Sequence, residues 1–532
     1  MIKSVIFFIL TLVLGVNGSS VDFCTQLQAN STNNPLLITV PNITIKYSDQ
    51  QLNNYNNKNL KCISIIGIVI LLLITLISTT YDNYITHTKR KHKISKLLTS
   101  FSLKRNFCEL MKENLTIEAE TISCIDGIRT ITVFSIVLLH INTEIIYFFA
   151  KYLHNPDDAL KFSKSILFMM AQQGQMGVDT CFMLSGLCLT YNFMRKYEFN
   201  WKNFNLIEHY LHRYVRLTPS YLAALIFYTL VHDLRPGPTF NENNVNFNMG
   251  CHGKWIKTLS YLDTGDYFDS CLPQGWTIDA DMKLYLMSPL ILLPLLMFGY
   301  TFIPIILIII LITIVKTYQT VILYNFTAQH AISMQVDYMR KIYYPLIVRS
   351  GPWFIGVIAG FLLFEHRNIK EKLLSKIQVT LLWIVATISL ISIICPMDFP
   401  PGIFKSVTYS SIMIPTYRII WSTAMAWVVY ACHHKYGNAL NTFLSYPFWQ
   451  IGAKLSYGVI LIHYTLILLI SKQQQTPVYF HEFHFFIMGL GVYLFSLLGA
   501  IPWTLVFEMP FRNLERELLW SDKNRKSYVK ID

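Results

Sequence analysis

The stretch SCIDGIRTITVFSIVLLHINTEIIYFFA, residues 123–150, decides the fold class. It is apolar enough to lie in a bilayer, yet it carries Arg129, His140 and Glu144. A membrane-spanning helix needs about 20 mainly apolar residues, and ionisable groups inside such a helix are costly and by default suggest a function. The stretch therefore predicts a membrane helix that turns polar side chains towards a protein interior.

The composition extends this prediction to the whole chain. Its 532 residues are 53% hydrophobic and 14% charged, and the mean hydropathy is +0.39. Soluble domains have about 45–50% apolar and about 25% charged residues. We therefore expect an all-α, polytopic integral membrane bundle. The formal net charge of +13 fits cytosolic loops rich in Lys and Arg, and because the sequence has no nucleic-acid-binding motif we expect no nucleic-acid partner.

The N-terminal region predicts entry into the secretory pathway. Residues 1–20 combine Lys3, a short apolar run and then small residues, which is typical of a cleaved signal peptide; a signal anchor is the alternative. Residues 21–60 are polar and carry glycosylation sequons at Asn30 and Asn42, so we expect a short lumenal or extracellular segment there. A first span at 61–81 then leads into a basic cytosolic linker at 82–122.

Further apolar runs lie within residues 123–508, followed by a basic cytosolic tail at 509–532. They predict about ten core helices in addition to the N-terminal span, with the long run 284–315 divided at FGYT, residues 298–301. The N-terminus is then lumenal or extracellular and the C-terminus cytosolic, in either the plasma membrane or an endomembrane. The runs are at roughly 127–150, 165–192, 214–232, 283–299, 301–317, 345–364, 377–396, 412–432, 456–471 and 484–507.

Two features of the predicted lumenal loops follow from this topology. Cys251 and Cys271 bracket part of the largest loop, where an oxidising compartment favours a disulfide; two free thiols are the alternative. Asn325 lies in a sequon on the same predicted side. The sequence has no CxxC pair, so we expect no metal site.

The polar groups of residues 123–150 share one helix face. Arg129 and His140 are eleven residues apart, which at 100° per residue is about 20° from three full turns and roughly 16 Å along the axis. Glu144 lies one turn further. The face either lines a polar interior or consists of a snorkelling arginine and a histidine that bonds a neighbouring helix.

Other predicted helices carry polar groups in similar positions. Arg213 and Arg216 are three residues apart on one face at a cytosolic helix entrance, where paired arginines can grip phosphate or merely anchor the helix. Further candidates for a polar cavity are Asp179, Ser185, Trp276, Asp281, Tyr285, Arg349, Arg418, Ser456, Tyr457 and His463.

The sequence contains five short motifs. They are Asp-Gly-x-Arg with a His eleven residues after the Arg (Asp126 to His140), Val178 to Gly186, Arg213-x-x-Arg216-x-x-Pro219, Trp276 with Asp281 and Tyr285, and Ser456-Tyr457 with His463. By these motifs residues 123–508 resemble the acyltransferase 3 superfamily, and most of all its animal branch, the nose resistant to fluoxetine proteins. The N-terminal segment is shorter and poorer in cysteine than is usual in that branch.

The resemblance implies an acyl transfer from cytosolic acyl-CoA to a hydroxyl of a lipid, carbohydrate or small molecule. By that resemblance Arg213 and Arg216 hold the donor phosphates, and Arg129 assists them. His140 acts as general base or carries the acyl group, since imidazole titrates near neutral pH, and Asp281 or Glu144 orients it. Membrane lipids are the expected surroundings, acyl-CoA is a co-substrate, and no cofactor is bound permanently.

Two other functions remain open at this stage. A transporter of lipids or hydrophobic compounds would also use acids and histidines within the membrane, although the sequence shows no pair of matching halves. A non-catalytic receptor or scaffold that keeps the fold is the third reading.

Overall fold

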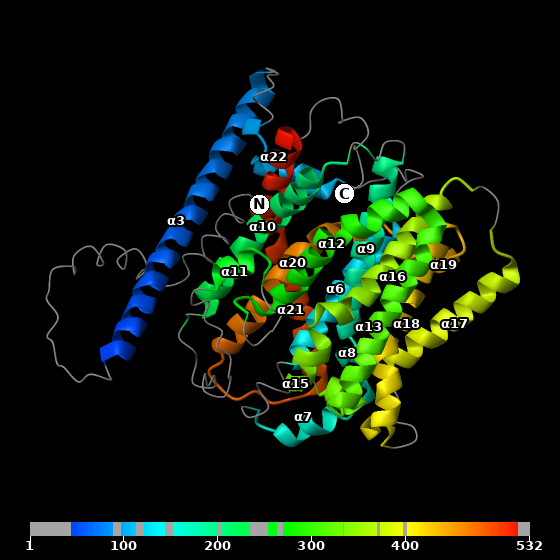
Figure 1. The fold of residues 1–532 in the computed structure, drawn as a ribbon. Coiled ribbons are helices and arrows are strands. Elements are labelled where there is room, and N and C mark those ends of the chain that lie inside the picture. Colours follow the sequence, from blue (N-terminus) through cyan, green and yellow to red (C-terminus); the bar gives the residue numbers. More distant parts are fainter. Residues whose placement is uncertain are drawn as a thin grey trace. The chain divides into compact units, whose positions relative to one another are not determined.

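The computed structural model is helical throughout its described part (Figure 1). No strand occurs in that part, and the one β-bridge joins Leu153 to Val478. The all-α prediction is therefore confirmed. The structure describes residues 44–88, 97–112, 122–143, 153–198, 202, 204–232, 234, 254–262, 270–333, 335–369, 373–396 and 402–519, and it describes side chains from residue 65 onward. Five features predicted from sequence lie outside these ranges: the signal peptide, Asn30, Asn42, Glu144 and Cys251.

Long helices dominate the order of elements. They are α3 (Thr44–Thr88), α6 (Cys124–Thr143), α9 (Gln175–Tyr197), α10 (Leu206–His232), α12 (Trp276–Phe298), α13 (Ile303–Leu323), α16 (Leu346–Glu365), α17 (Lys376–Ile394), α18 (Val407–His433), α20 (Phe448–Lys472) and α21 (Glu482–Trp503).

Short elements connect them. These are α5 (Leu103–Met111), α7 (Pro156–Phe162), α8 (Ile166–Gln172), α11 (Trp255–Leu259), η5 (Pro273–Gly275), η6 (Gly299–Phe302), α14 (Ala328–Ile332), α15 (Val336–Tyr338), η7 (Met339–Tyr343), η8 (Ile403–Lys405), α19 (Asn438–Leu444), η9 (Thr504–Glu508) and α22 (Met509–Leu519).

Nine helical stretches of the described chain are long and apolar enough to cross a membrane, so the chain is an integral, multi-pass membrane protein. The sequence predicted eleven spans. One stretch, 273–323, contains both α12 and α13, and the chain breaks between them at Gly299, whose φ of +56° suits glycine. Helix α9, which carries Asp179, Arg195 and Lys196, is not among the nine.

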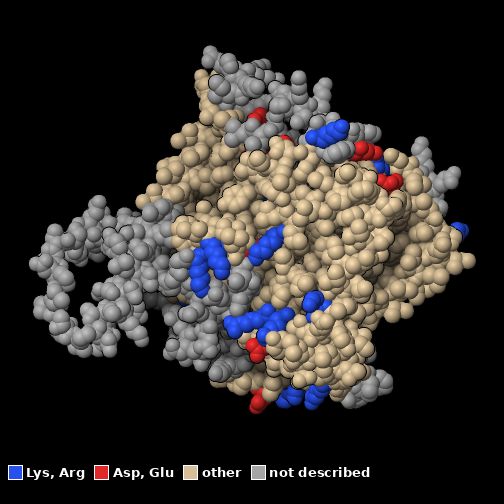
Figure 2. Space-filling view, viewed as in Figure 1, with Lys and Arg blue, Asp and Glu red and all other residues tan. Residues whose placement is uncertain are grey.

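The outward surface fits this conclusion. Most of the described surface visible in Figure 2 is free of charged side chains. Helix α17 presents large aliphatic side chains almost all along its length, including Ile377, which is 73% exposed, and Ile388, which is 63% exposed. Apolar surface of this extent is expected where lipid tails replace water.

The chain divides into two compact units, which we describe separately. The smaller comprises residues 1–108 and 501–514. Within it, Asp82 of α3 accepts hydrogen bonds from Ser102 (2.8 Å) and Arg105 (2.6 Å) at the start of α5. Thr79 Oγ1 also accepts from the Leu103 amide at 3.0 Å. The last of these bonds satisfies one of the backbone N–H groups that the N-terminus of α5 leaves free.

The larger unit comprises residues 109–500 and 515–532, and its centre is the close packing of α9 on α16. Glycines make the approach possible. A Cβ on Gly186 would collide with the Trp353 carbonyl, and a Cβ on Gly356 would collide with the Met183 carbonyl. Small residues are the usual means by which membrane helices bring their backbones together.

Helix α6 packs between α9 and α20, and α8 also lies against it. The sequence predicted one helix over 165–192, whereas the structure has α8 and α9 with a break at Gln173–Gly174. The break lies where the chain passes α6 closely, since a Cβ on Gly174 would collide with the Ser135 carbonyl. This packing places the polar face of α6 against α9 and α20.

Candidate functional site

A pair of histidines joins α6 to α20. His140 Nδ1 lies 2.9 Å from His463 Nε2, and the ring centroids are 5.0 Å apart. His463 is only 1% exposed, and its Nδ1 lies 3.0 Å from the Val459 carbonyl oxygen. The ring of Tyr464 packs edge-on against His140 at 5.6 Å. The two imidazoles are therefore fixed relative to each other inside the bundle.

The Val459 carbonyl fixes the tautomers of both imidazoles when they are neutral. A carbonyl oxygen only accepts, so His463 donates from Nδ1 and, when neutral, accepts at Nε2. His140 must then donate from its own Nδ1 to complete the 2.9 Å bond. Its Nε2 is left with a lone pair. A neutral imidazole held in this tautomer is able to accept a proton from a substrate.

A second cluster lies where α9, α10 and α12 meet. Asp281 accepts a hydrogen bond from Ser185 Oγ at 2.5 Å and forms an ion pair with Arg213. The Arg213 guanidinium lies 4.5 Å from the Tyr285 ring centroid, and that ring stacks on His209 at 4.3 Å. Among the described residues His463 is the hydrogen-bond partner of His140, whereas Asp281, one of the two carboxylates predicted to orient it, bonds Ser185 and Arg213. Glu144, the other, lies outside those residues.

His209 is a member of this cluster that was not among the residues predicted from the sequence, although its spacing carried a signal. His209 precedes Arg213 by four residues on α10, as Asp281 precedes Tyr285 by four on α12, and residues at this spacing share a helix face. The two facing pairs form the cluster. Tyr285 Oη also donates to the His209 carbonyl oxygen at 3.0 Å.

Two other arginines, Arg129 and Arg216, were predicted to bind the phosphates of acyl-CoA, and each has neighbours on α9 or α12. Arg129 is half-buried and donates to Cys188 Sγ on α9 at 3.5 Å. Cys181, two turns earlier on α9, interacts electrostatically with both Arg129 and Asp281. Arg216 is half-buried on α10 and interacts electrostatically with Tyr285. The arginines of α6 and α10 therefore border one region along α9.

A third group of predicted residues forms a separate buried ion triad. Asp179 is completely buried, and its two carboxylate oxygens accept from Arg349 Nη1 at 2.6 Å and from Arg418 Nη1 at 2.8 Å. Arg349 also donates from Nε to the Tyr343 carbonyl oxygen at 2.7 Å. The triad ties α9, α16 and α18 together. Trp276 lies over Arg349 at 5.1 Å.

The other predicted residues lie apart from these groups. Ser456 bonds within its own helix, to the Ala453 carbonyl oxygen at 2.7 Å, whereas Tyr457 Oη donates to the Leu217 carbonyl oxygen of α10 at 3.1 Å. Cys271 forms a disulfide. Asn325 is exposed just after α13, with a φ of +51°. No group of three or more metal-ligating side chains occurs within the described residues.

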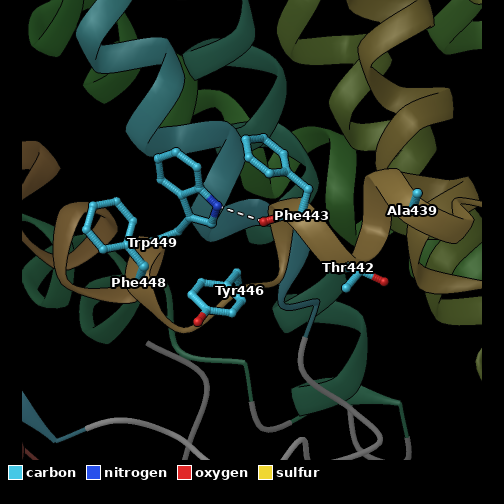
Figure 3. A pocket seen from close by; sticks show the side chains of 6 residues that line it. All are labelled: Ala439, Thr442, Phe443, Tyr446, Phe448 and Trp449. Atoms are coloured by element: carbon cyan, nitrogen blue, oxygen red, sulfur yellow. Dashed lines mark hydrogen bonds between the residues drawn. The ribbon is translucent and has the colours of Figure 1, made fainter.

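An open aromatic pocket of about 600 Å³ adjoins the first turns of α6. Figure 3 shows its wall, where Trp449 Nε1 donates to the Phe443 carbonyl oxygen at 2.7 Å. Thr130 of α6, next to Arg129, donates to the Trp449 carbonyl oxygen at 3.2 Å. The pocket is lined by Ala439, Thr442, Phe443, Tyr446, Phe448 and Trp449. None of these residues was among the candidates predicted from the sequence.

Comparison with known proteins agrees with the resemblance seen in the sequence. The chain is 24% identical over 471 residues to "Nose resistant to fluoxetine protein 6" of Caenorhabditis elegans, and the match covers 81% of this chain. The matched region spans 55% of the length of that curated relative. No solved structure matches the chain significantly. A family model described as an acyltransferase domain matches residues 122–509, and the chain therefore belongs to the acyltransferase 3 family.

Proposed function

We propose that this protein transfers an acyl group from acyl-CoA to a hydroxyl of a lipid, carbohydrate or small-molecule acceptor, with His140 as general base. The observation that carries the proposal is the hydrogen-bonded series from the Val459 carbonyl oxygen through His463 to His140, with distances of 3.0 and 2.9 Å. This series leaves the lone pair of His140 Nε2 available to an acceptor hydroxyl. Membership of the acyltransferase 3 family supports the reaction class.

The transfer balances with these two imidazoles and the two substrates. His140 Nε2 takes the proton of the acceptor hydroxyl while the oxygen attacks the carbonyl carbon of the thioester. The carbon–sulfur bond then breaks, an ester forms, and the CoA thiolate takes the proton back from His140. His463 keeps the His140 ring in place and accepts from its Nδ1–H throughout. General base catalysis of this kind contributes about 10²–10⁴ in rate.

The arginines suit the phosphates of the donor. Arg213 keeps one buried donor, Nε, without a partner among the described residues, although its Nη2 is bonded to Asp281. Arg216 lies three residues further along α10, and Arg129 of α6 lies near Cys188 of α9. Guanidinium groups bind phosphate through several parallel N–H donors. In this proposal Asp281 holds Arg213 in position while phosphate binds to the remaining N–H donors of that guanidinium.

The test is transfer of a radiolabelled acyl group from acyl-CoA by purified full-length protein, with extracted membrane lipids as acceptors. The wild type should form a hydroxylamine-sensitive ester, and His140→Ala should lose at least about 100-fold in rate. Arg367→Gln is the matched control, because Arg367 pairs with Glu198 on the surface. Equal rates for folded His140→Ala and wild type would exclude His140 as the base.

A further inference from the structure

The triad of Asp179, Arg349 and Arg418 holds an unbalanced charge. Two guanidinium groups face one carboxylate, and both oxygens of that carboxylate are already occupied, at 2.6 and 2.8 Å. All three side chains are at most 2% exposed. The triad therefore carries a formal charge of +1 inside the bundle, and burying an uncompensated charge costs several kcal/mol.

The arginines also keep hydrogen-bond donors that nothing in the described part of the chain accepts. Arg418 Nε and Nη2 are buried and have no partner there, and the same holds for Arg349 Nη2. Nε and Nη2 of Arg418 lie on one edge of the guanidinium and donate in parallel. This is the edge that guanidinium groups use to hold anions.

Two tyrosines close to Arg418 add further unpartnered groups. The Tyr417 ring lies 5.0 Å from the Arg418 guanidinium and Tyr338 is also a neighbour, and the hydroxyl groups of both are buried without a partner among the described residues. The Tyr343 ring also lies close, with its centroid 4.0 Å from Arg349 and 5.4 Å from Arg418. Among the described residues, Asp179 is the one carboxylate with which Arg418 interacts. Among the described residues the centre thus has positive charge in excess and unpartnered N–H donors, and it has no second carboxylate.

We propose that a small monovalent anion of the halide type is bound between α9, α16 and α18, held by the free edge of Arg418 and by Arg349. One such anion brings the formal charge of the centre to zero and accepts the unpartnered N–H donors. The near-complete burial of the triad argues for a monoatomic ion over a phosphorylated substrate. This site goes beyond the proposed acyl transfer and does not rest on it, because it shares no residue with the His140–His463 pair.

The test is the melting temperature of the purified full chain in potassium chloride, bromide or gluconate at constant ionic strength. A ligand that binds only the folded state raises stability in a saturable way, so both halides should raise the melting temperature and gluconate should not. Arg418→Gln should weaken the apparent halide affinity at least about tenfold, since charge-assisted bonds are the strong ones. Arg367→Gln, a surface arginine paired with Glu198, should respond like the wild type.

Equal melting temperatures in halide and gluconate would overturn the proposal. A wild-type halide response in Arg418→Gln would also overturn it, because the response would then arise elsewhere. If Arg418→Gln does not fold, bromide anomalous scattering from wild-type crystals decides. A bromide peak within hydrogen-bond distance of Arg418 Nε supports the site, and a centre without bromide refutes it.

Discussion

Replacing His463 tests how the proposed base is oriented. In His463→Ala the Nδ1–H of His140 loses the acceptor that lies 2.9 Å away. The His140 ring is then free to rotate and to exchange its tautomer, so that Nε2 is no longer held ready for the acceptor hydroxyl. His463→Gln is the matched variant, because its amide oxygen can accept in place of Nε2.

The size of the effect follows from the cost of that lost bond. Leaving a buried donor unsatisfied costs about 1–3 kcal/mol, and each 1.36 kcal/mol in a barrier is tenfold in rate, which gives a loss of about 5- to 150-fold in kcat for His463→Ala. The KM for acyl-CoA should stay within about twofold, since removing an interaction that acts on the chemical step leaves ground-state binding unchanged. His463→Gln should recover most of kcat.

The assay is steady-state release of the CoA thiol in the presence of the acceptor, with melting temperatures measured alongside. A positioning role requires the split between kcat and KM together with rescue by glutamine. If His463→Gln is as slow as His463→Ala while both proteins are folded, orientation through the Nε2 acceptor is refuted. A kcat for His463→Ala equal to that of wild type would refute it as well.

Three further predictions concern stability. Asp179→Asn leaves two buried arginines without their carboxylate and should lower the free energy of unfolding by about 3–5 kcal/mol, measured by thermal unfolding; an unchanged melting temperature would contradict the triad. Gly356→Ala puts a methyl group against the Met183 carbonyl and should lower the free energy of unfolding by about 1–3 kcal/mol. In the control Gly491→Ala the methyl group meets open space, so the free energy of unfolding should not fall. Equal losses of stability in the two variants would contradict the close packing of α9 on α16. Burial first and then two neighbouring histidines lower the pKa of His434 to about 4. As the pH falls, the unfolded chain therefore binds this proton before the folded chain does, so the free energy of unfolding should be constant above about pH 6.5 and decrease towards pH 4. His434→Gln should reduce that decrease, and an unchanged pH profile would contradict the prediction.

The sequence predicted the helical membrane fold because apolar runs of bilayer length admit few other structures. It also placed the break between α12 and α13 within residues 298–301, where Gly299 has a φ of +56°. It did not predict the break at Gly174, since that depends on the Ser135 carbonyl of another helix. A local sequence pattern predicts which secondary structure a segment can form, but it does not predict where a segment distant in the sequence will pack closely against it.

The same limit applies to the candidate site. Helical spacing placed Arg129 and His140 on one face of α6, yet the partner of His140 lies 323 residues further along the chain. Asp179, Arg349 and Arg418 were recognised as polar groups inside the membrane, but their union in one triad depends on the packing of α9, α16 and α18. Candidate residues could be selected by type and position, whereas their pairing required the fold.

The role of His140 as the base is tested by the rate of CoA thiol release by wild type, His140→Gln and Arg367→Gln in matched, folded preparations with acyl-CoA and acceptor. We expect turnover by wild type and by Arg367→Gln, and a loss of at least about 100-fold in His140→Gln. Turnover by His140→Gln at the wild-type rate, or no turnover by any of the three proteins, would contradict it.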